Sequence, residues 1–367
     1  MQVPYLKYYI NRNICLIISK KACKYAIIYT KIFLGDKFTM NNFNYEASEM
    51  DLRQRKHFEK KDLRKTVSRL SFIPILWIVL STLFVLLSIS FYSNTGKDGQ
   101  NTIIAIASLL AYIVLFYIFS RLFNVGFSTM FPFNKIKSKS TMFGFIGLAT
   151  SFMVCCSRLF ALIILLLQYL GINTQFITNT FDKLQDSDLF DINNPISIII
   201  HILYAAIIPA VFEELMYRGI CLGLLRKYGD GFAIIISSLI FSFAHGNIIQ
   251  SPFAFVVGLF LGYMAVKFNS LLPGIIAHFL NNSLNTIADI LENIGIEKPQ
   301  FIITAIAIAI GIISLIYLIK KKDFKLNSIK KSESLLTHAE KFRYSLFNAG
   351  MICLIIVTII LTNNLAH

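Results

Sequence analysis

The chain has 367 residues, of which 56% are hydrophobic and 15% are charged, and its formal net charge is +15. Its mean hydropathy is +0.64. Soluble domains average about 45–50% apolar and about 25% charged residues. The composition therefore excludes an ordinary cytosolic globule, a disordered chain and a disulfide-stapled secreted domain. Six cysteines without a Cys-x-x-Cys pair indicate neither a zinc ribbon nor a redox dithiol.

Residues 1–50 form a basic N-terminal stretch. Its apolar runs, Ile14–Ile18 and Tyr25–Leu34, are too short or too interrupted by lysines to cross a membrane. It has neither the continuous apolar region nor the small-residue cleavage site of a signal peptide. Two interpretations stay open: an interfacial basic helix, or translation from Met40 or Met50, which would leave this stretch out of the native product.

The rest of the chain predicts an all-α, polytopic membrane helix bundle of about nine transmembrane helices. A spanning helix needs about 20 mostly apolar residues to cross about 30 Å of hydrocarbon. The candidates are Ser71–Tyr92, Thr102–Phe123, Thr141–Gln168, Pro195–Leu225, Gly231–Ile249, Phe253–Phe268, Leu271–Leu291, Phe301–Ile319 and Leu346–Leu361.

Positive charges alternate along the predicted loops. The segment 51–70 is basic, and so is the loop between the last two spans. The loops of the other set hold few lysines beside acidic residues, which are Asp182, Asp186, Asp188, Asp191, Glu292 and Glu297. By the positive-inside rule, the N-terminus is cytoplasmic and the C-terminus is outside. The net charge then reflects topology, and no nucleic-acid partner is expected.

The span Pro195–Leu225 carries buried charge. Glu214 and Arg218 are four residues apart in the favourable order, so they are expected to form an ion pair. Glu213 lies about 100° round the helix and has no partner in the same span. Pro209, four residues earlier, predicts a bent or opened backbone there. Asn194 is the predicted N-cap, with Pro195 at the first helical position.

Two further spans carry polar groups in Phe241-x-x-x-His245 and His278-x-x-x-Asn282. Each residue alone is compatible with a satisfied core side chain. Together with Glu213, however, they predict one shared polar cavity within the membrane. At 1.5 Å per residue, Glu213, His245 and Asn282 lie about 16–21 Å from the cytoplasmic ends of their spans, and His278 only about 10 Å. His278 reaches that level only if its span begins deeper, which Pro273-Gly274 would allow.

These residue types suit hydrolysis without a side-chain nucleophile. A carboxylate in a low-dielectric cavity can act as general base for water, and a neighbouring imidazole can orient that water. A second imidazole and an amide can donate hydrogen bonds to a developing oxyanion.

Taken in order within about 70 residues, Glu-Glu-x-x-x-Arg, Phe-x-x-x-His and His-x-x-x-Asn resemble the CAAX-processing and bacteriocin-processing (CPBP) family of intramembrane glutamic endopeptidases. The resemblance covers Pro195 to about Leu291. It implies that Glu213 is the catalytic base and His245 its water-positioning partner. It also implies that His278 and Asn282 stabilise the oxyanion, with Glu214 and Arg218 as the supporting pair. Tyr217 stands where many members have Phe.

The resemblance implies an intramembrane endopeptidase that uses a glutamate-activated water on a prenylated, CAAX-like peptide or on a bacteriocin or signalling peptide. The implied partners are a peptide or lipidated-protein substrate and the lipid bilayer of a bacterial cell membrane, without metal or other cofactor. The oligomeric state is left open.

The domain organisation follows from these assignments. Residues 51–70 are a cytoplasmic basic segment, 71–190 are accessory transmembrane helices, 195–291 are the catalytic core, and 301–367 are C-terminal helices with a basic loop.

Three alternatives stay open. The chain has no His-Glu-x-x-His, but two Glu and two His can in principle hold a metal ion. A non-catalytic membrane or immunity protein would carry the same motifs without turnover. Arg158, in the third span, is expected either to pair with Glu213 or Glu214 or to meet a substrate carboxylate.

Overall fold

The computed structural model describes residues 39–92, 95–124, 126, 131–178, 193–323 and 333–366. The chain divides into two units, residues 1–59 and 60–367. Most of the basic N-terminal stretch (residues 1–38), the acidic loop with Asp182–Asp191 and part of the last basic loop (residues 324–332) lie outside the described residues.

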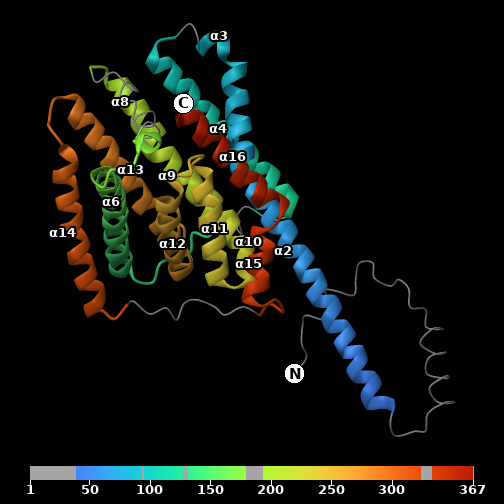
Figure 1. The fold of residues 1–367 in the computed structure, drawn as a ribbon. Coiled ribbons are helices and arrows are strands. Elements are labelled where there is room, and N and C mark those ends of the chain that lie inside the picture. The colour runs from blue at the N-terminus through green and yellow to red at the C-terminus, as the bar shows by residue number, and fades with distance from the viewer. Residues whose placement is uncertain are drawn as a thin grey trace. The chain divides into compact units, whose positions relative to one another are not determined.

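The described part of the chain is built from helices (Figure 1). The first are α2 (Thr39–Leu87), α3 (Ile89–Tyr92), α4 (Lys97–Phe123) and α6 (Lys139–Tyr169). A broken helical path follows: α8 (Pro195–Ile202), η2 (Leu203–Ile207), α9 (Ile208–Glu213), η3 (Glu214–Leu222), α10 (Gly223–Leu225) and η4 (Arg226–Tyr228). The last are α11 (Asp230–Ala244), α12 (Ser251–Phe268), α13 (Leu272–Asn293), α14 (Pro299–Lys320), α15 (His338–Leu346) and α16 (Ala349–Ala366).

Six of the described helical segments are long and apolar enough to cross a membrane, and a seventh is added if the bent pair α15–α16 counts as one span. The predicted number of about nine is therefore not confirmed. Two predicted spans, Gly231–Ile249 and Leu271–Leu291, account for the difference between nine and seven. The helix α11 ends at Ala244, where a span to Ile249 was expected, and so has only 15 residues. The helix α13 has 22 residues, but it carries His278 and four asparagines along its length.

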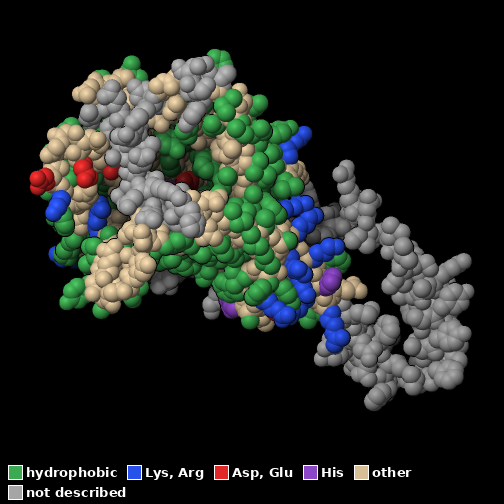
Figure 2. All heavy atoms as spheres, turned by 45° about the horizontal axis from the view of Figure 1, so that its top comes forward, with side chains coloured by type: hydrophobic (Ala, Val, Ile, Leu, Met, Phe, Trp, Pro, Cys, Tyr) green, Lys and Arg blue, Asp and Glu red, His purple; other side chains and the backbone are tan. Residues whose placement is uncertain are grey.

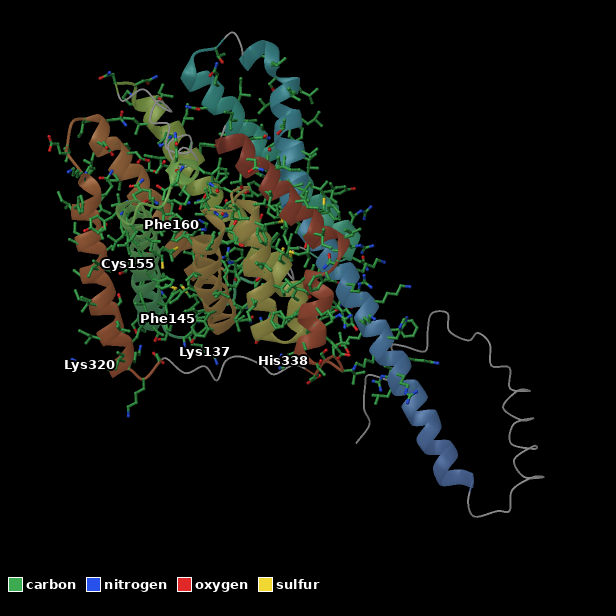
Figure 3. The ribbon with its side chains drawn as sticks, in the orientation of Figure 1. Lys137, Phe145, Cys155, Phe160, Lys320 and His338 are labelled. Atoms are coloured by element: carbon green, nitrogen blue, oxygen red, sulfur yellow. The ribbon has the colours of Figure 1, made fainter. Side chains whose placement is uncertain are left out.

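The surface suits a lipid environment. Figure 2 shows hydrophobic side chains over most of the described surface on the face in view. Figure 3 places Lys137, Lys320 and His338 at the same end of the bundle, while Cys155 and Phe160 lie further along it. Lys137 precedes α6 and Lys320 ends α14, so two loops of the predicted basic set meet at one end of the molecule.

Small residues allow close helix packing. The helix α14 packs along α6, and α11 packs along α12. A Cβ atom added at Gly311 of α14 would overlap Ser151 of α6, and one at Gly258 of α12 would lie 2.9 Å from Cβ of Ser238 on α11. Such small-residue contacts are typical of helix pairs in membranes. The helices α6, α11, α12 and α13 all contribute residues to the cavity described below.

Candidate active site

The helical segment that carries the two glutamates departs from regular α-helical geometry before and after α9, which ends at Glu213. As predicted, Asn194 caps α8 by accepting a hydrogen bond from the Ile196 N–H at 3.1 Å, and Pro195 is the first helical residue. The π-helical segments η2 and η3 flank the single regular stretch α9. Pro209, the second residue of α9, has no N–H to donate, so the regular hydrogen-bond ladder is interrupted there. The predicted distortion near Glu213 is therefore confirmed, and π-helical turns of this kind are frequent at functional sites.

Glu214 and Arg218 form the predicted ion pair. Nη1 of Arg218 lies 2.7 Å from Oε1 of Glu214, and both side chains are 1% exposed. The guanidinium also donates to the Gly258 carbonyl at 3.5 Å and lies over the Phe241 ring, 4.2 Å from its centroid. Because each charge is buried, the pair and its extra contacts are needed to compensate for lost hydration.

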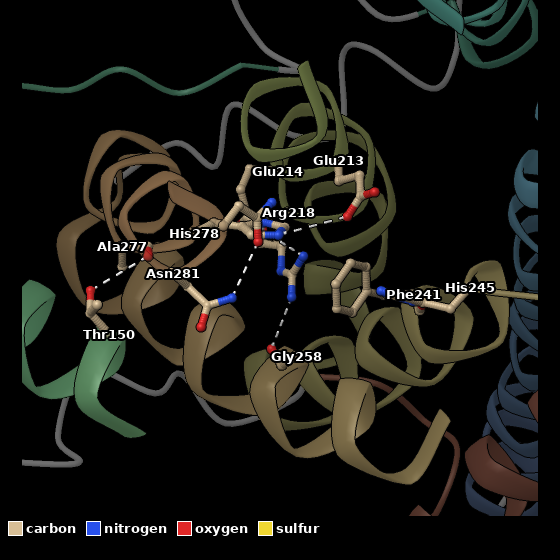
Figure 4. A network of polar contacts seen from close by, with 11 residues as sticks. Thr150, Glu213, Glu214, Arg218, Phe241, His245, Gly258, Ala277, His278 and Asn281 are labelled. Atoms are coloured by element: carbon tan, nitrogen blue, oxygen red, sulfur yellow. Dashed lines mark hydrogen bonds and ion pairs between the residues drawn. The ribbon is translucent and has the colours of Figure 1, made fainter. Parts of the chain in front are cut away.

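His278 joins this pair to Glu213 (Figure 4). Its Nδ1 lies 3.2 Å from Oε1 of Glu214, and its Nε2 lies 3.9 Å from Oε2 of Glu213. A carboxylate oxygen only accepts, so Nδ1 carries the hydrogen and Nε2 is directed toward Glu213. The Glu213 side chain is 22% exposed, in contrast to Glu214.

Gly274 explains how His278 reaches the glutamates. The position expected from helix rise alone was too shallow, unless Pro273-Gly274 allowed a deeper start. A Cβ atom at Gly274 would lie 3.1 Å from Oε2 of Glu214, so the missing side chain lets α13 approach η3 closely. The backbone of α13 thereby brings His278, one turn further on, to the same carboxylate.

His245 is fixed at the end of α11. It is the C-cap residue of that helix, and its Nδ1 lies 3.1 Å from the Phe241 carbonyl oxygen. Since a carbonyl only accepts, Nδ1 carries the hydrogen and Nε2 of the neutral ring is left as an acceptor. The ring also packs edge-on against Phe241, with 4.9 Å between centroids.

Phe241 is the aromatic centre of the site. Besides Arg218 and His245, the rings of Tyr217 and His278 pack against it, with centroids 5.2 Å and 6.3 Å away. The sequence identified Phe241 only as the first residue of a motif. Its role in packing residues from η3, α11 and α13 together becomes visible in the fold.

A cavity of about 230 Å³ lies beside these residues. Its lining includes three of the predicted site residues, His245, His278 and Asn282, whereas Glu213, 3.9 Å from Nε2 of His278, is not among the lining residues. The other lining residues are Met153, Ser157, Phe160, Phe241, Gln250, Phe253, Ala254, Val257, Asn281 and Asn285. One wall is thus rich in amides, and the other is apolar. Asn281, Asn285 and Gln250 were missed by motif reasoning, although Asn281 and Asn285 lie within one turn of Asn282.

A residue from outside the motif helices also borders Glu213. The Tyr112 ring of α4 is buried and stacks on Phe212, with 5.2 Å between centroids. Tyr112 and Tyr217 both lie near enough to interact with the Glu213 charge. No sequence signal distinguished Tyr112 from the other aromatic residues of its span.

Arg158 does not form the ion pair considered for it. Its Nε donates to Oγ1 of Thr304 on α14 at 3.3 Å, and the nearby charge is that of Asp289. Glu214 is instead paired with Arg218. Arg158 therefore links α6 to α14 rather than to the glutamates.

Within the described ranges, no three His, Cys, Asp or Glu side chains are grouped so as to hold a metal ion. Glu214, one of the four ligands considered in the metal alternative, is occupied by Arg218 and His278.

The apolar helices and the buried charged network define a class, a multi-pass integral membrane protein with a polar site among its helices. Residues 195–284 match the family model of the type II CAAX prenyl endopeptidase Rce1-like proteins. This match confirms the resemblance to the CPBP family, a family of membrane proteases, and all six predicted site residues lie inside it. No curated protein and no solved structure matches the chain.

Proposed function

We propose that this protein is an intramembrane endopeptidase in which Glu213 activates a water molecule. The observation that carries the proposal is the position of His278. It links the carboxylates of Glu213 and Glu214 to a cavity that also receives His245 and Asn282. The family match supports peptide-bond hydrolysis as the reaction class.

In the proposed reaction, the Glu213 carboxylate takes a proton from water while the water oxygen bonds to the scissile carbonyl carbon. His245 accepts a hydrogen bond from that water at Nε2, because its Nδ1–H is held by the Phe241 carbonyl. Asn282 donates to the developing oxyanion, and His278 joins it as a donor only in the imidazolium form, in which Nε2 carries a second hydrogen. As the tetrahedral intermediate collapses, the C–N bond breaks and Glu213 returns its proton to the leaving amine.

The proposed substrate is a membrane-associated peptide, either a prenylated, CAAX-like C-terminus or a bacteriocin or signalling peptide. Comparing peptide termini in membranes that contain active protein or the Glu213→Gln variant would identify it. Termini that shift only with the active protein mark the substrate.

We also propose a cytoplasmic N-terminus, supported by the loop charges and by the shared end of Lys137 and Lys320. Reporter fusions after Lys139 should read cytoplasmic and those after Asp186 external. The reverse pattern would overturn the orientation.

The central test uses purified protein in proteoliposomes and a panel of internally quenched peptides. The panel contains S-farnesylated CAAX-type peptides, their unmodified forms and apolar leader peptides. Glu213→Gln keeps the shape but removes the base, so turnover should fall by at least about 10²-fold. Glu297→Gln changes an exposed carboxylate and is the matched control, with turnover unchanged.

The test separates the alternatives. EDTA should leave turnover unchanged, because the proposal gives no role to a metal ion. Loss with EDTA and recovery with zinc would favour a metalloprotease. Cleavage by Glu213→Gln at the original rate would contradict the glutamate base, and a wild-type protein that cleaves nothing in the panel would favour a non-catalytic role.

A further inference from the structure

Two neighbouring amides on α13 are bonded to each other. Nδ2 of Asn281 donates to Oδ1 of Asn282 at 3.2 Å, and both side chains line the cavity. Consecutive residues on a helix ordinarily point about 100° apart and do not face each other. Here both amides turn toward the cavity and meet there.

This bond decides which end of the Asn282 amide remains available. An asparagine side chain keeps nearly the same shape when its amide is rotated by 180°, but donor and acceptor exchange places. An oxyanion can be stabilised only by the donor end. Because Asn281 occupies Oδ1 of Asn282, Nδ2 is the end left to donate to the substrate oxygen.

We propose that Asn281 is a positioning residue that fixes the Asn282 amide with its N–H groups toward the scissile carbonyl. The inference rests on the proposed function and deepens it. In His278-x-x-x-Asn282, Asn281 occupies one of the unspecified positions, so the motif itself assigns it no role.

The decisive variant is Asn281→Asp. It is nearly isosteric, but an aspartate only accepts, so it draws Nδ2 of Asn282 toward itself and turns Oδ1 toward the cavity. We expect kcat to fall roughly 10- to 100-fold, as for an amide held in the wrong orientation by a charged partner, with KM nearly constant. Asn281→Ala only frees the amide, so kcat should fall by about two- to fivefold.

The measurement is a double-mutant cycle on a panel peptide that the wild-type protein cleaves. Asn281→Asp and Asn281→Ala are each made alone and together with Asn282→Ala. If Asn281 acts through Asn282, neither should lower kcat further once Asn282 is alanine, because coupled residues are not additive. Asn293→Ala is the matched control, since Asn293 lies on the same helix and donates to the Asp289 carbonyl, away from the cavity.

Each outcome is informative. Equal losses in both backgrounds, or a raised KM with unchanged kcat, would overturn the inference and make Asn281 a direct substrate contact. If Asn281→Asp does not fold, the two alanine variants give the same cycle. If Asn282→Ala alone keeps the wild-type kcat, the oxyanion assignment within the proposed function fails. If Asn282→Ala is slow but Asn281→Asp is not, only the present inference fails.

Discussion

The helix α14 and the segment η3 both lie in apolar stretches of the same bundle. They differ in how much of their surface is buried: one side of α14, but nearly all of η3. In α14 the buried residues form one narrow stripe: Pro299, Ile303, Ala307, Gly311, Ser314 and Leu318. In η3 every residue except Leu215 is buried, including Glu214 and Arg218. A stripe at intervals of three or four residues is what a helix with one packed face requires.

The difference shows two ways to hold a helix in a membrane. The helix α14 is held by close approach, since its small residues meet Gly147 and Ser151 of α6 while all its isoleucines except Ile303 stay exposed. The segment η3 is held by a charged pair whose extra bonds reach α12 and α13. Changes in α14 should therefore affect stability alone, whereas changes around η3 should affect both stability and turnover.

Glu214→Gln should have the largest effect on stability. It leaves the Arg218 guanidinium buried without its 2.7 Å partner, which costs about 3–5 kcal/mol. The same change weakens the hold on Nδ1 of His278, so turnover per folded molecule should fall too. Unfolding in detergent and the folded yield would measure the first effect, with the exposed Glu297→Gln as control. Wild-type stability would mean that the pair contributes no net stabilisation.

Gly311→Ala should disturb the small-residue contact between α14 and α6. The new Cβ would overlap Ser151 of α6, and overpacking costs about 1–3 kcal/mol. Turnover per folded molecule should not change, because α14 contributes no residue to the cavity lining. Ser151→Gly in the same chain should restore much of the lost stability. A changed kcat with intact stability would contradict the separation between the two helices.

The sequence predicted contacts within one helix better than contacts between helices. The Glu214–Arg218 pair, the Asn194 cap and the distortion near Pro209 depend on local spacing, and all three are confirmed. The count of about nine spans was less secure, because α11 and α13 are short or polar where they border the site.

Contacts between helices depend on depth and rotation, which helix rise alone does not give. His278 was expected about 10 Å from the end of its span, yet it bonds to Glu214 because Gly274 admits the neighbouring carboxylate. Arg158 bonds to Thr304 rather than to a glutamate for a similar reason: α6 packs along α14. Tyr112 comes from α4, outside every motif, and only the fold brings it to Glu213.

Gly274→Ala should have the smallest effect. It tests the close approach between α13 and the segment η3, which carries Glu214. The added methyl would lie 3.1 Å from Oε2 of Glu214, so the carboxylate must shift by a few tenths of an ångström. Alanine also favours the helix over glycine by up to about 1 kcal/mol, which offsets part of the crowding. Net stability should therefore change by less than about 1 kcal/mol, while kcat falls by a few-fold as His278 loses its alignment, roughly 1 kcal/mol in the barrier.

Gly223→Ala is the matched control, because nothing lies within 4 Å of a Cβ at that position. It should keep kcat and hold or slightly raise stability. If Gly274→Ala matched this control in both measurements, the close approach of α13 to Glu214 would not be what aligns His278.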